Sequence, residues 1–236
     1  MNEHPILFSG EMVRAILEGR KTQTRRIVKP RGVSSDVAAW LHVMAKGVDM
    51  PCPYGQVGDR LWVRETFVLE RWEDEPDKLP TDRPVCHYQP VDVTNEYDNE
   101  YWNIPHYRAT DPAPDLYYGD IDEHDDGEPK CKWRPSIFMP RWASRILLEI
   151  VDIRFERLQE ITKEDAKAEG VSHIWRWTPD RNPDHFRRGV LNPYIANYSV
   201  LWDEIHAESL IGDGWNANPW VWVIKFNRLE SVHASA

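Results

Sequence analysis

A long acidic segment between two stretches of patterned apolar sequence is the feature that most limits how this chain of 236 residues folds. Residues 70–129 contain 18 Asp and Glu against 4 Lys and Arg, with many prolines and little periodicity, which predicts a surface insertion. On both sides, apolar residues recur at strand and helix spacings, without the regular alternation of strands and helices that parallel sheets require. The sequence therefore predicts an α+β fold with one domain over residues 1–236 and surface insertions at about 70–129 and 171–192.

Short strands and amphipathic helices are expected in the patterned stretches. Ser9 is a suitable N-cap for a first helix, and Thr162 with Asp165 resembles a capping box at the start of a later one. Gly19 and Gly170 are placed to end these two helices. The other expected elements are strands at 5–8, 60–64, 145–155 and 221–226 and an amphipathic helix at 193–206.

The start of the chain and its cysteines favour the cytoplasm. Acidic and basic residues occur within the first twenty positions, so no signal peptide is expected, and no apolar run approaches the ~20 residues of a membrane span. Cys52, Cys86 and Cys131 are widely spaced and odd in number, which predicts reduced thiols. Since no CxxC pair occurs, we expect no metal site and no cofactor.

Charge is distributed unevenly along the chain, whose net charge is −10. Between Arg14 and Arg31 there are seven basic residues and one acidic residue, Glu18. A small basic site on an acidic body favours a nucleoside or a short single-stranded RNA as partner and disfavours duplex DNA, which needs an extended phosphate-binding surface.

Lys21 and Thr24 are the first candidates for chemistry in this basic segment. They are three positions apart after a helix end, and on a helical turn such residues face the same way. A lysine with a neutral amine can take the proton of a neighbouring hydroxyl, and the flanking Arg20, Arg25 and Arg26 lower the pKa of that amine by like-charge repulsion. From spacing alone, a solvated basic turn without a catalytic role explains the pattern better.

Three blocks of sequence resemble the ASCH-domain family of the PUA-like superfamily. GRKTQTRR (residues 19–26) is similar to the signature that opens ASCH domains, and GDRLWVRE (58–65) looks like the family's second block. LQEITKEDAKAEGV (158–171) resembles the third block, a strand end followed by a short acidic helix. PRWASRI and NPWVWVIKF are shared with the larger ASCH proteins of phages and prophages.

The resemblance implies a small mixed β-barrel with flanking helices, whose cleft accepts a base or nucleoside. In small bacterial members it implies a metal-independent amidohydrolase that removes the acetyl group from N4-acetylcytidine with a Lys, a Thr and a Glu. These roles match Lys21 as base, Thr24 as nucleophile and Glu169 as proton carrier.

Five further residues are candidate substrate contacts. Arg20 and Arg26 would supply positive charge. Either Arg26 or a backbone N–H would stabilise an oxyanion. Tyr54 and Trp62 are candidates for stacking on a base, although core packing explains them better, and Glu65 would face either the cleft or a salt bridge. Two alternatives to the hydrolase remain open: a non-catalytic module that binds RNA or a modified base, and an RNA-cleaving member of the fold.

Overall fold

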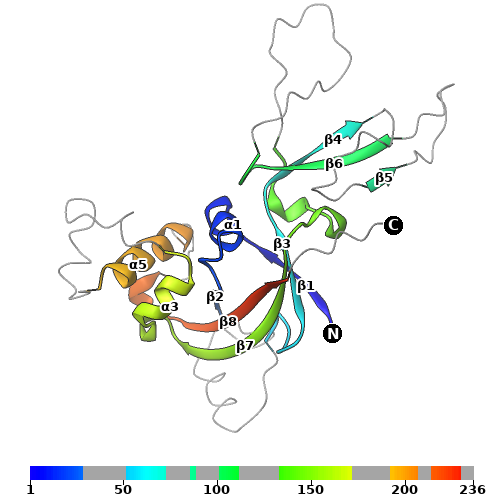
Figure 1. The fold of residues 1–236 in the computed structure, drawn as a ribbon. Helices are drawn as coiled ribbons and strands as arrows, with labels where there is room; N and C mark the ends of the chain where they lie inside the picture. The colour runs from blue at the N-terminus through cyan, green and yellow to red at the C-terminus, as the bar shows by residue number, and fades with distance from the viewer. Residues whose placement is uncertain are drawn as a thin grey trace, which may run out of the picture. The chain divides into compact units, whose positions relative to one another are not determined.

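A computed structural model of the chain describes residues 1–28, 52–72, 86–88, 101–111, 133–171, 192–206 and 214–229. Within these ranges the fold is α+β, as the sequence predicted, with strands in two sheets (Figure 1). The strands are β1 (Glu3–Leu7), β2 (Gln23–Ile27), β3 (Arg60–Arg64), β4 (Phe67–Trp72), β5 (Cys86–Tyr88), β6 (Tyr101–Tyr107), β7 (Leu147–Arg157) and β8 (Trp220–Leu229). The helices are α1 (Gly10–Leu17), α3 (Lys163–Ala168) and α5 (Pro193–His206), and the short 3₁₀ helices are η2 (Ser136–Phe138), η3 (Arg141–Ala143), η4 (Leu158–Glu160) and η5 (Trp215–Ala217).

The larger sheet has five strands in the order β1-β3-β7-β8-β2. Its edge strands are β1 and β2, and no pairing between them closes the sheet within the described residues. The barrel expected from the family resemblance is therefore not seen as a closed structure in this part of the chain. None of the described helices is both long and apolar enough to cross a membrane.

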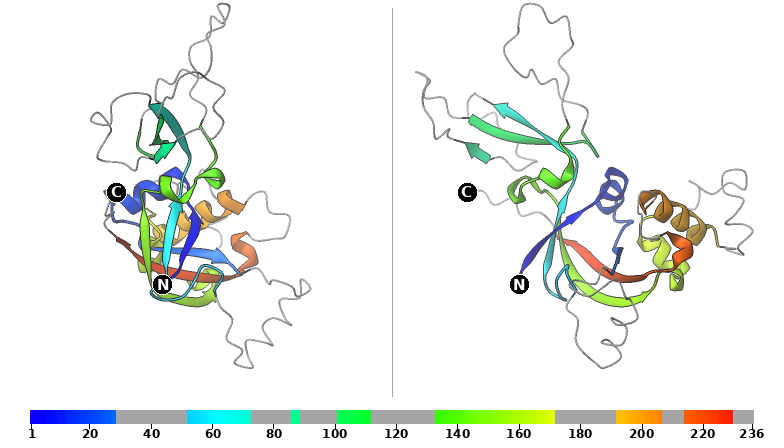
Figure 2. Two further views of the ribbon diagram at one scale, coloured as in Figure 1. Left: turned by 90° about the vertical axis from the view of Figure 1, so that its right-hand side faces the viewer. Right: turned by 180° about the vertical axis from the view of Figure 1, so that it is seen from behind.

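The chain divides into two compact units. The first consists of residues 1–2, 15–60 and 149–228, and the second of residues 3–14, 61–148 and 229–236. In the first unit, β2 pairs antiparallel with β8, so that Thr24 lies opposite Ile224 and Arg25 opposite Val223. In the sheet, β8 lies between β7 and β2, and Figure 2 shows these strands from two further directions.

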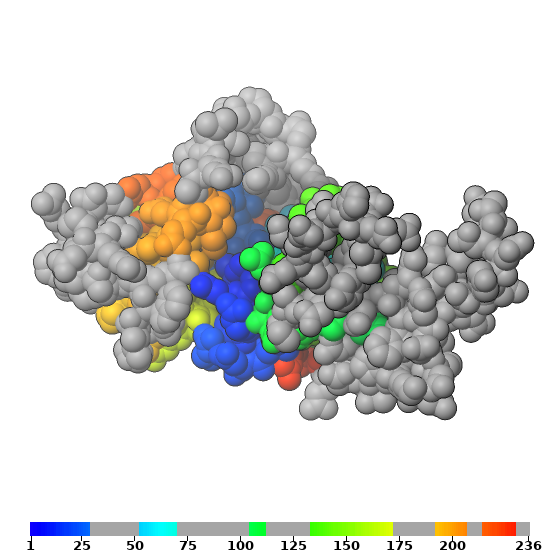
Figure 3. All heavy atoms as spheres, turned by 90° about the horizontal axis from the view of Figure 1, so that it is seen from above, coloured from blue at the N-terminus to red at the C-terminus, as the bar shows by residue number. Residues whose placement is uncertain are grey.

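One face of this sheet is covered by α3 and α5. Val221 and Val223 of β8 pack in one buried cluster with Ala166 of α3 and with Tyr198 and Trp202 of α5. Burial of such a cluster is the main favourable contribution to folding of the unit, because apolar area leaves water. Atoms of α5 form part of the molecular surface (Figure 3).

The second unit contains part of the predicted insertion as an ordered sheet. Strands β4, β6 and β5 form a three-stranded antiparallel sheet, which the low periodicity of residues 70–129 did not reveal. Its buried cluster contains Phe67, Tyr107, Met139 and Ala143. The rest of the 70–129 prediction, and most of the 171–192 insertion, lie outside the described residues.

Candidate functional site

Strand β2 places alternate side chains on the face that α3 covers. Lys21, just before the strand, and Arg25 within it both contact Glu169, and Gln23 donates a hydrogen bond to the Asp165 carbonyl. Successive side chains of a strand point to opposite faces, so residues 21, 23 and 25 share one face. The expectation of a helical turn at Lys21–Thr24 is wrong, because this segment is extended and pairs with β8.

The end of α3 brings Glu169 to Lys21. Thr162 caps the helix, with the reciprocal Asp165 contact of a capping box, as the sequence predicted. Glu169 is the C-cap, and Gly170 follows with φ of 87°, a conformation that favours glycine. A Cβ on Gly170 would lie 3.0 Å from the Lys21 Cβ, so the missing side chain allows the helix end to approach the strand.

The Lys21 amine and the Glu169 carboxylate form a buried ion pair. Lys21 Nζ lies 2.7 Å from Glu169 Oε2 and also donates a hydrogen bond of 3.1 Å to the Glu169 carbonyl oxygen. Side-chain exposure is 1% for Lys21 and 3% for Glu169, so water screens the pair little. Lys21 and Glu169 are 148 positions apart in sequence, and an isolated antiparallel β-bridge between these two residues brings them together.

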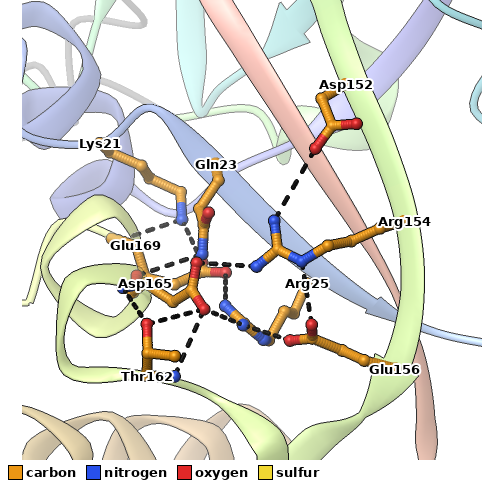
Figure 4. Close-up of polar contacts among 9 residues, drawn as sticks. All are labelled: Lys21, Gln23, Arg25, Asp152, Arg154, Glu156, Thr162, Asp165 and Glu169. Atoms are coloured by element: carbon orange, nitrogen blue, oxygen red, sulfur yellow. Dashed lines mark hydrogen bonds and ion pairs between the residues drawn. The ribbon is translucent and has the colours of Figure 1, made fainter.

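Arg25 links this pair to a larger network of charges (Figure 4). Its Nη1 lies 3.1 Å from Glu169 Oε1, and its Nη2 lies 2.6 Å from Glu156 Oε1 and 3.4 Å from Asp165 Oδ2. Arg154 contacts the second carboxylate oxygen of Glu156 and of Asp165, with distances of 2.9 Å to Glu156 Oε2 and 2.7 Å to Asp165 Oδ1. The two guanidinium groups thus alternate with carboxylates across β2, β7 and α3.

Burial governs the pKa of the amine at this site. The pKa of Lys21 is lowered, first because burial disfavours its charged form, and then by the positive charges of Arg26 and Arg25; the contact with Glu169 opposes this. Burial and the nearby Glu169 raise the pKa of Tyr198 well above its usual value. Burial also acts to raise the pKa of Asp165, but hydrogen bonds from Arg154 and Thr162 outweigh it and lower that pKa to about 2.

Thr24 lies apart from the other two residues of the predicted triad. It is buried, with 3% exposure, and by strand alternation its side chain is on the face opposite Lys21 and Arg25, beside Ile224 of β8. Within the described part of the chain its hydroxyl makes no hydrogen bond to Lys21 or Glu169. The structure therefore brings together two of the three predicted catalytic residues.

Among the candidate substrate contacts, Arg20, Arg26 and Tyr54 belong to the first unit. Arg26 is partly buried; burial lowers the pKa of its guanidinium, and the charges of Tyr54 and Glu169 act in the opposite direction. Arg20 is exposed and contacts Glu18 and the Gly170 carbonyl.

Glu65 and Trp62 belong to the second unit. Both carboxylate oxygens of Glu65 accept hydrogen bonds from Arg145, at 2.9 and 3.0 Å, so the salt-bridge interpretation of this residue is the one observed. Trp62 lies under the Arg64 guanidinium, 4.9 Å from ring centroid to Cζ.

No group of three His, Cys, Asp or Glu side chains within the described ranges is arranged to hold a metal ion. Cys52 is a free thiol whose pKa is raised by burial. The side chains of Cys86 and His87, and the whole of Cys131, lie outside the described residues.

Arg25 is the residue that the sequence reasoning missed. It was considered only as one of several flanking positive charges. Had residues 21–27 been interpreted as a strand, the two-residue period would have placed Arg25 on the same face as Lys21 and Gln23. The β-branched Thr22, Thr24 and Ile27 were the available signal for a strand.

Comparisons with protein-family models, with curated proteins and with solved structures found no match. A buried amine with a lowered pKa, hydrogen-bonded to a carboxylate that a second cation also holds, is suited to exchanging a proton within a site protected from water.

Proposed function

We propose that this chain is an ASCH-domain protein of the PUA-like superfamily that hydrolyses the N4-acyl amide of acylated cytosine nucleosides, such as N4-acetylcytidine, in the cytoplasm. The observation that carries the proposal is the buried contact of 2.7 Å between Lys21 and Glu169. The family resemblance assigns these two residues to one catalytic set, although 148 positions separate them, and a solvated basic turn would not bury the lysine.

In the proposed reaction, the neutral Lys21 amine takes the proton of Thr24, and the Thr24 oxygen attacks the acyl carbonyl carbon. The bond between that carbon and N4 breaks, N4 receives a proton through the Lys21–Glu169 pair, and the unmodified cytosine leaves. Water then attacks the threonine ester, giving the free carboxylic acid and restoring the hydroxyl. The first step requires a contact between Lys21 and Thr24 that this structure lacks. The Thr24 variant therefore tests the step of the proposed reaction that the geometry supports least.

Burial of Lys21 favours the hydrolase over an RNA-cleaving function. A lysine with 1% side-chain exposure, already paired with a carboxylate, is poorly placed to stabilise a phosphate of an RNA backbone. Salt dependence separates the classes. Turnover of a neutral nucleoside is insensitive to salt, whereas binding through phosphates weakens steeply with rising salt, because releasing the bound counterions then yields less free energy.

The test is release of cytidine from N4-acetylcytidine, followed by absorbance, for the native protein and for Lys21→Ala, Thr24→Val and Glu169→Gln. We expect turnover by the native protein and a loss of about 100-fold or more in each folded variant. Thr24→Val keeps the side-chain shape, so its loss would identify the hydroxyl as nucleophile. Absence of turnover with acetyl and longer N4-acyl substrates would contradict the proposal and direct attention to RNA binding.

A further inference from the structure

The two oxygens of the Glu169 carboxylate are divided between two cations. Lys21 Nζ contacts Oε2 at 2.7 Å, and Arg25 Nη1 contacts Oε1 at 3.1 Å. We propose that Arg25 is a positioning residue, which holds the Glu169 carboxylate so that Oε2 remains directed at the Lys21 amine. This inference rests on the proposed function only for its kinetic consequence, since the contact itself can be tested without turnover.

Arg25 is itself held from a second direction. Its Nη2 lies 2.6 Å from Glu156 Oε1, and the other oxygen of Glu156 accepts a hydrogen bond from Arg154. Asp165 connects the same two arginines, at 3.4 Å and 2.7 Å. Because a guanidinium is planar and rigid, fixing Nη2 on these acids also fixes the direction in which Nη1 points.

The surroundings make this contact strong. The Arg25 side chain has no exposed surface, and Glu169 is 3% exposed, so solvent competes little for either group. The guanidinium of Arg25 also lies over the ring of Tyr198, with Cζ 5.9 Å from the ring centroid. A carboxylate held by a flexible, solvated partner would not keep one oxygen on the lysine.

The charge of Arg25 acts on Lys21 through the same contact. The charged groups that act on the amine are Glu169 at the end of α3 and Arg26 and Arg25 of β2. Arg25 opposes a positive charge on Lys21 and shares the carboxylate that would otherwise stabilise that charge alone. Removing the guanidinium should therefore raise the pKa of Lys21.

The first test measures that titration directly. The side-chain resonances of Lys21 are followed against pH by lysine-selective NMR and assigned by their loss in Lys21→Arg. We expect Arg25→Gln to raise the pKa of Lys21 and Arg25→Lys to restore it part of the way. Arg145→Gln is the matched control, since it removes the arginine partner of another buried carboxylate, Glu65, in the other unit, and it should leave the Lys21 titration unmoved.

The second test is kinetic. We expect Arg25→Gln to lower kcat for N4-acetylcytidine by about 10- to 100-fold, the effect of one lost charged hydrogen bond, with KM changed less than about threefold. Arg25→Lys should recover part of kcat. If Arg25→Gln does not fold, the comparison of Arg25→Lys with the native protein decides the question by the same two readouts.

The outcomes separate this inference from the proposed function. A native protein that turns over no N4-acyl nucleoside contradicts the proposed function, while a changed Lys21 titration in the Arg25 variants still supports the positioning contact. Normal turnover together with an unchanged titration and unchanged kcat in folded Arg25→Gln and Arg25→Lys overturns the inference alone.

Discussion

Glu65 and Glu169 are both buried carboxylates that contact arginine, yet their surroundings differ. Glu65 gives both oxygens to one partner, Arg145, in a paired geometry at 2.9 and 3.0 Å. Glu169 gives one oxygen to Arg25 and the other to Lys21. Arg145 in turn lies 3.9 Å from the centroid of the Tyr107 ring, which packs in the core of its unit.

The two arrangements suit these buried carboxylates to different roles. A carboxylate whose two oxygens both bind one guanidinium has no neighbouring group with which to exchange a proton. Such a carboxylate contributes to folding. A carboxylate divided between an arginine and a lysine retains a neighbour whose pKa burial has already lowered, so a proton can move within the group. We therefore expect changes at the Glu65 pair to affect stability and changes at the Glu169 cluster to affect turnover.

Glu169→Gln should give the largest effect. The amide cannot accept and return a proton, so we expect kcat for N4-acetylcytidine to fall by about 10²- to 10⁴-fold, the usual contribution of general acid–base catalysis. Steady-state kinetics on protein shown to be folded by circular dichroism measures it. A loss below tenfold would place Glu169 in the same structural class as Glu65 and remove the contrast.

Arg145→Gln should destabilise the protein by about 3–5 kcal/mol at pH 7, because Glu65 is left buried without its cation. Burial raises the pKa of Glu65 even with Arg145 present, so the carboxyl group of the variant can become protonated on acidification, and the loss should shrink between pH 7 and pH 5. Urea unfolding at the two pH values tests both statements. A kcat per folded molecule that falls as far as in Glu169→Gln would contradict the division between the regions.

Gly170→Ala should combine a stability loss with a disturbed site. The new Cβ would lie 2.9 Å from the Ala15 Cβ and 3.0 Å from the Lys21 Cβ, in a residue with φ of 87°. Strain and overpacking together predict a cost of about 2–4 kcal/mol. Gly58→Ala is the control, because Gly58 has φ of 90° but nothing within 4 Å of its added Cβ, and it should cost about 1 kcal/mol. Equal losses, measured by urea unfolding, would show that the helix end does not press on Lys21.

Asp165 should produce the smallest effect. Its pKa is about 2 in the folded chain and 3.8 in its unperturbed state, so its stabilising contribution is complete above pH 4 and disappears as the pH falls through 2. After allowance for solvent screening, we expect a loss of about 1 kcal/mol over this range that Asp165→Asn does not show. Urea midpoints at pH 5 and pH 2.5 for both proteins provide the measurement, and parallel curves would exclude the contribution.

Local signals predicted most elements of the fold correctly. The Thr162–Asp165 capping box and the helix at 193–206 were confirmed, as was the strand with inward Leu61 and Val63. These features depend on neighbours in sequence, which is why periodicity and capping reveal them. The second sheet was missed because β5 and β6 lie in a segment rich in charge and proline. The pairing of two strands also produces little recognisable pattern in the sequence of either strand.

The candidate site was predictable in part for the same reason. The resemblance supplied Lys21 and Glu169, and the structure brings them into contact. Thr24 was placed beside Lys21 on the assumption of a helical turn, and the extended backbone puts it on the other face. Arg25 was overlooked because its partners, Glu156, Asp165 and Glu169, are distant in sequence, and only the folded sheet brings them within reach.

The pairing of β2 with β8 has a consequence for how the protein is made. Thr24 and Arg25 lie opposite Ile224 and Val223, so the strand that carries the cluster acquires its partner from the far end of the sequence. Closing such a distant contact is slow and costs chain entropy before any interaction compensates it. On a ribosome, Lys21 would remain in water with an ordinary charged amine until β8 had emerged. A nascent chain that ends before residues 220–229 would therefore lack the strand that pairs with β2.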